Sequence, residues 1–391
     1  MPWKKEATVL KLRKEFVTLA TRENANMSQL CRRFNISRKT GYKWLRRWKA
    51  EGDSGLTDRS RRPANSPNKT PDYIEQKVLA TQQTYSEWGA GKLRARILRE
   101  IDQGSMNLPK DQVPAASTIL AILKRHNRWE TPDYGPGQPV ANTRFERDKP
   151  NQLWQLDFKG EFALLNQQLC YPLTLVDDHS RFNLSLQALE NTQHETVKSA
   201  LIDVFRRYGL CDELLVDNGP PWGSGIRDHN NRPYYTKLGV WLMRLGIKVT
   251  HSRPGHPQTH GKNERFNGTL KAELLNHENF RDHSHSQQRF DWWRDRYNFE
   301  RPHQSLDDDV PMDRYHPSWR EYPETLPPVE YDSTDEIRKV NQSGCISYQG
   351  TLYKIGKGFV GQRVAIRNQK DSPKKSIYFC HQVIKEIHLQ N

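Results

Sequence analysis

Three acidic residues stand out because of the segments that contain them. Asp157 lies in the apolar segment LWQLDFKG, Asp217 follows the apolar run ELLV, and Glu264 lies in HGKNERFNGTLKAE. Carboxylate oxygens are the ligands that hard divalent cations prefer. Two Mg²⁺ ions about 3.5–4 Å apart stabilise the attacking and leaving oxygens when a phosphodiester is displaced. The three acids are therefore candidate catalytic residues and candidate ligands of two Mg²⁺ ions, for which Mn²⁺ can substitute.

The pattern around each acid indicates the element that positions it. Strand alternation puts Asp157 on a face of its own strand away from its apolar neighbours, and Asp217 ends a short buried strand, where ligands of open sheets tend to bind. Glu264 falls in the first turn of a helix, between the cations Lys262 and Arg265. The apolar stripe of that helix consists of Phe266, Leu270 and Leu274. An early Glu can instead simply complement the helix dipole, but the two upstream acids favour the catalytic interpretation.

Residues 144–320 contain strands that alternate with helices. Strands are expected at 153–162, 170–177, 182–188, 213–216 and 247–250. Helices are expected at 195–208, 238–245 and 286–298, besides the helix that carries Glu264. This order predicts an α+β domain in which helices pack on a mixed sheet. Asp177 and Asp178 also end a strand, and we interpret them as turn and sheet-end acids.

The chain is strongly basic, and its charge is concentrated near the amino terminus. The 391 residues include 61 Lys and Arg against 46 Asp and Glu, a formal net charge of +15. Residues 1–63 hold 17 basic and 6 acidic residues, a net charge of +11. This distribution indicates a nucleic-acid partner, and a mean hydropathy of −0.93 argues against a membrane. The five cysteines form no CxxC pair, which suits the reducing cytoplasm and, for a DNA-binding protein, the bacterial nucleoid.

Residues 8–50 are typical of a helix-turn-helix domain. A first helix at 9–20 is followed by a short helix at 28–34, a turn, and a basic helix capped by Ser37. The expected DNA contacts on this last helix are Arg38, Lys39, Lys43, Arg46 and Arg47. The alternative is a three-helix bundle with a solvated basic face.

The segment after these helices, residues 51–71, is a linker rich in polar residues, Gly and Pro. Its Arg59, Arg61 and Arg62 suit either a basic arm in a narrow minor groove or a soluble tether. Beyond it, residues 72–130 suit a second helix-turn-helix-like domain, with Ser117 expected as the N-cap of its last helix.

The carboxyl-terminal strands, expected at 345–355, 360–366, 376–380 and 383–387, suit a small SH3-like β-barrel. DNA-backbone binding and oligomerisation are its alternative roles. The sequence therefore predicts four domains: 1–63, 64–130, 144–320 and 332–391.

The segments NQLWQLDFKG, LVDDHSRF, LLVDNGPP and SRPGHPQTHGKNERFNGTLKAE together resemble the integrase core of bacterial insertion-sequence DDE transposases, in the retroviral-integrase superfamily. The resemblance implies an RNase H-like fold, with Asp157, Asp217 and Glu264 as the catalytic acids. It implies cleavage at the 3′ ends of an insertion element, strand transfer into target DNA, and a homo-oligomer assembled on double-stranded DNA. It also makes Lys262, Arg265 and Lys271 expected DNA contacts. Whether an accessory ATPase is required stays open.

Two features depart from the family pattern. The 46 residues between Asp217 and Glu264 exceed the usual spacing, and the excess lies in WGSGIRDHNNRPYYTK, an inserted loop that we expect to help hold DNA. The chain also lacks the amino-terminal HHCC zinc module of retroviral integrases. His251, His256 and His260 are therefore interpreted as loop and phosphate-contacting residues.

Two other functional classes are compatible with parts of this pattern. A catalytically inactive, transposase-derived DNA-binding regulator would keep the helices and lose the chemistry. An RNase H-like nuclease acting on RNA–DNA hybrids would not need a sequence-reading amino-terminal domain. The presence of all three acids together with that domain favours a transposase, a polynucleotidyl transferase that integrates DNA.

Overall fold

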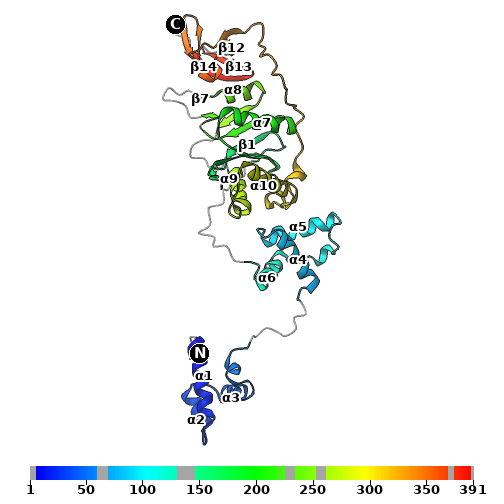
Figure 1. Cartoon of the computed structure of the whole chain (residues 1–391), viewed down its shortest axis with the longest axis vertical. Coiled ribbons are helices and arrows are strands. Elements are labelled where there is room, and N and C mark those ends of the chain that lie inside the picture. The colour runs from blue at the N-terminus through cyan, green and yellow to red at the C-terminus, as the bar shows by residue number, and fades with distance from the viewer. Residues whose placement is uncertain are drawn as a thin grey trace. The chain divides into compact units, whose positions relative to one another are not determined.

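The computed structural model of the chain describes residues 6–59, 69–129, 146–218, 220–224, 234–251, 261–368 and 374–388. Within these residues the chain forms two compact units, Met1–Lys69 and Thr70–Asn391 (Figure 1). The finer division into four domains stays a prediction. Among the described helices, none combines the length and apolarity needed to cross a membrane.

The first unit contains three helices: α1 Glu6–Ala20, α2 Met27–Arg33 and α3 Arg38–Glu51. The Ser37 side chain accepts the backbone N–H of Thr40, so the predicted N-cap of α3 is confirmed. A 3₁₀ turn, Gly52–Leu56, follows α3 within the segment predicted to be a linker. The buried core consists of Phe16, Val17, Cys31, Trp44 and Leu56.

Gly41 lets the helices of the first unit approach closely. A Cβ at this position would lie 2.6 Å from Cys31 Sγ and 2.9 Å from Phe16 Cζ. We therefore expect Gly41→Val to lower the free energy of unfolding of residues 1–69 by about 1–3 kcal/mol, as overpacking does. Urea unfolding measures this loss, with the exposed Gln29→Ala as control. Equal midpoints for the two variants would contradict the close helix packing.

The second unit begins with α4 Asp72–Thr84, α5 Ala90–Asp102 and α6 Ala116–Arg125. The prediction that Ser117 caps α6 is wrong, because α6 already begins at Ala116 and Ser117 lies inside the helix. Ala115 occupies the cap position, without a side-chain hydrogen bond. These helices enclose an apolar core that includes Trp88, Leu93, Ile97 and Ile119.

Residues of this helical group contact the segment that follows the central sheet. Tyr85 Oη donates to Glu300 Oε2 at 2.9 Å. The Arg99 guanidinium donates to both carboxylate oxygens of Asp313, at 2.6 and 2.9 Å. These hydrogen bonds join the helical group to residues that follow the central sheet within the second unit.

The central domain is built on a mixed sheet, as predicted. Its strands are β1 Leu153–Phe158, β2 Phe162–Ala163, β3 Leu169–Asp177, β4 Asn183–Leu189, β5 Glu213–Val216 and β8 Lys248–His251. The strand order is β2-β3-β1-β5-β8, with β4 paired to β3. The pairs that β3 makes with β1, β2 and β4 are antiparallel, whereas β1, β5 and β8 run parallel. The carboxyl ends of β1, β5 and β8 therefore share one edge of the sheet.

Helices cover this sheet (Figure 1). The first cluster of buried residues includes residues of α7 His194–Tyr208 and α8 Lys237–Arg244 together with Trp154 and Leu156. The second includes α9 Gly261–Leu270 and α10 His283–Asp295 with Val176 of β3. π-helical turns, Lys271–Leu275 and Arg296–Glu300, extend α9 and α10. The stripe predicted for the helix of Glu264 is buried: Phe266, Leu270 and Leu274. In the inserted segment, β6 Gly223–Ser224 pairs with β7 Tyr234–Tyr235.

The carboxyl-terminal part is antiparallel β structure. β9 Glu336–Lys339, β12 Arg363–Asn368, β13 Lys374–Phe379 and β14 Gln382–His388 form a sheet ordered β14-β13-β12-β9. The strand predicted at 345–355 is instead a hairpin of β10 Cys345–Tyr348 and β11 Thr351–Lys354, because Gln349 and Gly350 adopt positive φ values. Closure of these strands into an SH3-like barrel stays a prediction.

This carboxyl-terminal part shares a hydrophobic core with α8. Val240 and Met243 of α8 pack in the same cluster as Ile346, Tyr348 and Phe359. Gln382 Nε2 also donates to the backbone oxygen of Ile247 at 3.2 Å. These contacts join the carboxyl-terminal strands to the central domain.

Candidate active site

Asp157 and Asp217 come together at the carboxyl edge of the sheet. β1 and β5 are parallel, and Gln155 pairs with Leu215. Asp157 and Asp217 each follow two residues later, so the same register places them side by side. Burial and the nearby charge of Asp217 raise the pKa of Asp157 to about 6. The sequence placed these two acids at strand ends, and the parallel pairing of those strands makes them neighbours.

Asn267 connects α9 to this pair of acids. Its Nδ2 donates to Asp157 Oδ2 at 2.8 Å, a bond that favours the charged carboxylate. Asn267 lies three residues after Glu264, hence close to it on the surface of α9. Asn267 was not predicted as a site residue from the sequence. The sequence signal that could have indicated it is the position of this amide side chain, one helical turn after Glu264.

Glu264 is an exposed residue of the first turn of α9. The contact of α9 with Asp157 is made by Asn267, which lies one helical turn after Glu264. In the parts of the chain that the structure describes, no three His, Cys, Asp or Glu residues form a group that could hold a metal ion. The assignment of all three acids to one catalytic set accordingly stays a prediction.

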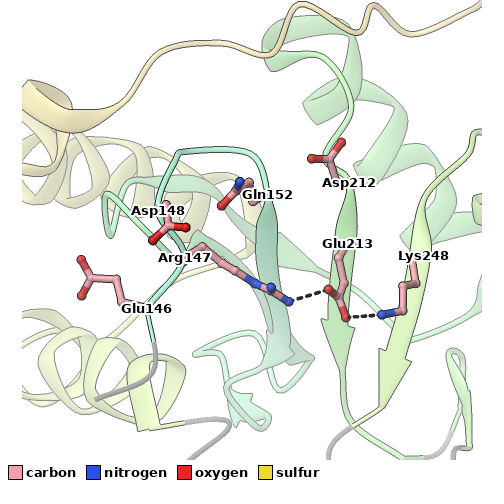
Figure 2. A pocket seen from close by; sticks show the side chains of 7 residues that line it. All are labelled: Glu146, Arg147, Asp148, Gln152, Asp212, Glu213 and Lys248. Carbon is pink, nitrogen blue, oxygen red and sulfur yellow. Dashed lines mark hydrogen bonds and ion pairs between the residues drawn. The ribbon is translucent and has the colours of Figure 1, made fainter. Parts of the chain in front are cut away.

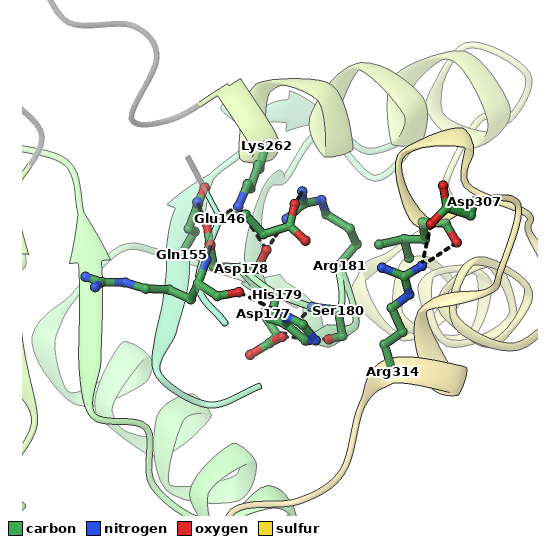
Figure 3. Close-up of polar contacts among 12 residues, drawn as sticks. Glu146, Gln155, Asp177, Asp178, His179, Ser180, Arg181, Lys262, Asp307 and Arg314 are labelled. Atoms are coloured by element: carbon green, nitrogen blue, oxygen red, sulfur yellow. Dashed lines mark hydrogen bonds and ion pairs between the residues drawn. The ribbon is translucent and has the colours of Figure 1, made fainter. Parts of the chain in front are cut away.

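A second group of buried polar residues surrounds the end of β3 (Figure 3). Asp178 is fully buried, and its Oδ1 accepts from Gln155 Nε2 at 2.8 Å and from Lys262 Nζ at 2.6 Å. Its Oδ2 accepts the backbone N–H of Arg147 at 2.8 Å. Arg181 donates to the backbone oxygen of Asp178. Asp178 thus joins residues from three separate parts of the chain.

The neighbouring Asp177 stabilises the turn between β3 and β4. Its Oδ1 accepts the backbone N–H of Ser180 at 2.8 Å and the Ser180 hydroxyl at 2.6 Å, and its Oδ2 accepts the N–H of Asn151 at 2.8 Å. Burial raises the pKa of this carboxyl, and the three donors oppose that rise. The interpretation of Asp177 as a turn acid is confirmed. Asp178 follows the end of β3, and it also contacts α9 through Lys262.

Lys262, one of the expected DNA contacts, is largely buried, and its role as a DNA contact stays a prediction. Its ammonium also donates to the backbone oxygen of Asp178 at 2.9 Å, and its side chain is only 15% exposed. Burial and the nearby charge of Arg181 lower the pKa of Lys262 to about 8. The ammonium therefore lies against the buried carboxylate of Asp178. Arg265 and Lys271, by contrast, are exposed as a DNA contact requires.

The basic residues expected on α3 also lie outward. Exposed side chains include Arg38, Lys39, Lys43 and Arg46, whereas Arg47 is half-buried. The Lys43 ammonium lies 4.6 Å from the centre of the Trp44 ring, so that buried ring supports part of the basic surface. Arg59 forms an ion pair with Glu51. Arg61, Arg62, His256 and His260 lie outside the described residues.

His251, at the end of β8, is half-buried, and burial lowers its pKa. A neutral ring at physiological pH is a weaker phosphate contact than a charged one. Its interpretation as a phosphate-contacting residue stays a prediction.

A charged pocket lies at the opposite edge of the sheet from the two acids (Figure 2). It is lined by the first residues of β5 and β8, Glu213 and Lys248, and by Arg147. The Arg147 guanidinium donates to Glu213 at 2.7 Å, and the Lys248 ammonium lies 3.4 Å from the other oxygen of the same carboxylate. These pairs neutralise Glu213, and the pocket is separate from the candidate active site.

Family models match most of the chain in segments. Integrase core domain models match residues 147–257 and 245–311. A model of the carboxyl-terminal domain of IS481 family transposases matches residues 335–391. A helix-turn-helix domain model matches residues 12–64, and a homeodomain-like model matches residues 40–108.

Proteins of insertion elements are similar over the central region. The uncharacterised 31.7 kDa protein of IS407 from Burkholderia multivorans is 28% identical over 157 residues, which are 40% of this chain and 52% of the relative. The uncharacterised 39.2 kDa protein of IS476 from Xanthomonas euvesicatoria is 25% identical over 254 residues, 64% of this chain and 67% of the relative. The chain therefore contains an integrase core domain and is similar to proteins of bacterial insertion elements. The match spans about half the length of the first relative.

The helix-turn-helix match covers α2 and α3, so the prediction of an amino-terminal helix-turn-helix is confirmed. Among solved structures, the catalytic core domain of HTLV-2 integrase, solved with magnesium, is 17% identical. The match covers 43% of this chain and 99% of the integrase chain, with a TM-score of 0.33.

Proposed function

We propose that this chain is the DNA transposase of an insertion sequence. It binds the terminal inverted repeats of its element, cleaves at their 3′ ends and joins those ends to target DNA. The observation that carries the proposal is the pair of adjacent carboxylates, Asp157 and Asp217, at the carboxyl edge of the sheet, held by Asn267 from the helix of Glu264.

The residues at this edge fit a divalent metal ion. The negative charge of Asp217 repels that of Asp157 and raises its pKa. A pair of adjacent carboxylates also supplies the hard oxygen donors that Mg²⁺ prefers. Asp157, Asp217 and Glu264 would hold the metal, which supplies charge stabilisation to the oxygens of the reacting phosphodiester. Two ions per site, and replacement by Mn²⁺, are part of the proposal.

The chain itself positions the groups that react. Asn267 fixes one oxygen of Asp157, next to Asp217. Water first attacks the phosphorus that joins the element to the flanking strand. The bond from phosphorus to the 3′ oxygen of the element breaks, so the element keeps a 3′-hydroxyl and the flanking strand keeps a 5′-phosphate. That hydroxyl then attacks a target phosphodiester, so a new bond to phosphorus forms as the target bond breaks and its 3′ oxygen leaves with a proton. The exposed cations of α3 bind the element end, and Arg265 and Lys271 lie on the helix of the site. A homo-oligomer would pair the two ends.

An end-joining assay tests the proposal. The element's ends are identified as inverted repeats that bracket the coding sequence, and duplexes carrying them are incubated with the full chain, Mg²⁺ and a supercoiled plasmid. We expect 3′ cleavage followed by joined products, both lost with a chelator or with scrambled ends. Specific binding without joining would instead identify an inactive DNA-binding regulator. Cleavage confined to RNA–DNA hybrids would identify an RNase H-like nuclease.

A further inference from the structure

The helix that carries Glu264 is held at two points, one on β1 and one at the β3–β4 turn beside it. One is the bond from Asn267 to Asp157, and the other is the contact of Lys262 with Asp178, which also accepts from Gln155 of β1 (Figure 3). Glu264 lies between Lys262 and Asn267 in the sequence. The two anchors therefore lie on either side of the candidate catalytic acid.

The spacing of the anchors matches along the helix and along the strand. Lys262 and Asn267 are five residues apart, which is about 7.5 Å along a helix axis. Gln155 and Asp157 are two residues apart on one face of the strand, which is about 6.6 Å. Because these lengths agree, α9 can be held at both points without distortion, and its position along β1 is fixed.

The Lys262 anchor also sets the rotation of α9. Successive residues of a helix are about 100° apart, so Lys262 and Glu264 project from opposite flanks. Asn263, between them, is fully buried, and neither polar atom of its side chain has a hydrogen-bond partner. This amide does not hold the turn, so among the described residues of the first turn the polar anchor is Lys262.

We propose that Asp178 and Lys262 are a positioning pair that sets the place and rotation of α9, and thereby directs Glu264 toward Asp157 and Asp217. The proposal rests on the proposed function for the role of Glu264. A fully buried carboxylate paired with a largely buried ammonium is costly to separate, because either partner alone would leave a charge in the interior. That cost makes the pair a rigid connection between the β3–β4 turn and the active-site helix.

Neutral variants of each partner in the full chain test the pair. We expect Lys262→Met and Asp178→Asn to lower the rate of end joining about 10–100-fold, the range typical for residues that orient metal ligands. The KM for end DNA should be unchanged. The Mn²⁺ concentration that gives half of the maximal shift in melting temperature should rise by a similar factor. The double variant should lose no more than the stronger single variant, because both remove one interaction.

Two further variants separate positioning from general damage. Arg289→Met breaks the Arg289–Glu278 ion pair on α10, and both readouts should stay as in the wild type. Lys262→Arg, which keeps the charge, should restore part of the Mn²⁺ response, and Lys262→Gln replaces Lys262→Met if that variant does not fold. Unchanged Mn²⁺ dependence in the neutral variants, or an equal loss in Arg289→Met, would overturn the proposal. If the wild type joins no ends, the proposed function fails, while the Mn²⁺ titration still decides the positioning pair.

Discussion

Asp157→Asn and Asp217→Asn should each reduce end joining by ~10³-fold or more, because several kcal/mol of charge stabilisation is lost with the metal site and each tenfold in rate is about 1.4 kcal/mol. Glu264→Gln should have the same effect. Specific binding to end DNA should remain, since the first unit supplies it. Each amide keeps the shape of the acid and removes a repelling charge, so we expect the melting temperature in a chelator not to fall.

The measurement is the end-joining assay with Mg²⁺ beside a binding assay on the same duplex. Asp203→Asn, an exposed acid of α7, is the matched control and should behave as the wild type. Joining at the wild-type rate by any one of the three variants would remove that residue from the catalytic set. The result for Glu264 carries the most information, because the described residues bring only the other two acids together.

Residues 1–69 should bind end DNA specifically without Mg²⁺, and their affinity should fall steeply with salt. A protein that contacts 6–10 phosphates loses about 10³–10⁵-fold in affinity between 50 and 200 mM salt, as counterions are released. Residues 70–391 should bind weakly and without sequence preference, and should fail to join ends because they cannot select them. Footprinting of both fragments on one end sequence, at two salt concentrations, measures this division.

Substitutions on α3 refine the same experiment. If Arg46 reads a base, Arg46→Ala should cost about 1–3 kcal/mol and relax one position of the site. If it contacts a phosphate, binding to all sequences should weaken alike and the salt dependence should become flatter. Lys11→Ala is the matched control, because it also removes one positive charge but from the exposed surface of α1. A specific footprint from residues 70–391 would move the sequence reader away from the first three helices.

Local patterns were sufficient to predict the elements that hold the candidate site. β5 was predicted and found at Glu213–Val216, because a short apolar run there stops at a turn signal, and three of its four residues are buried. The helix of Glu264 followed from its apolar stripe, which is buried as expected. The level placement of Asp157 and Asp217 required the order and direction of the strands, which local periodicity does not give.

Long-range pairing was not predictable in the same way. Lys262 and Asp178 are 84 residues apart, and each looks like an ordinary surface charge in the sequence. Only the sheet topology brings the β3–β4 turn to the start of α9 and buries both groups. The bond between Asn267 and Asp157 spans 110 residues and was missed for the same reason.

The shared core of α8 and the carboxyl-terminal strands limits how the parts of this protein can be exchanged with those of relatives. Gly358 approaches the backbone of β7 so closely that a Cβ there would lie 2.5 Å from the Tyr235 oxygen. Val240 and Met243 pack against the same strands. A chimaera that replaced only the residues after 332 would pair foreign side chains with a native α8 surface. The unit of exchange, in engineering or in natural recombination, must therefore include residues 234–244 together with the carboxyl-terminal strands.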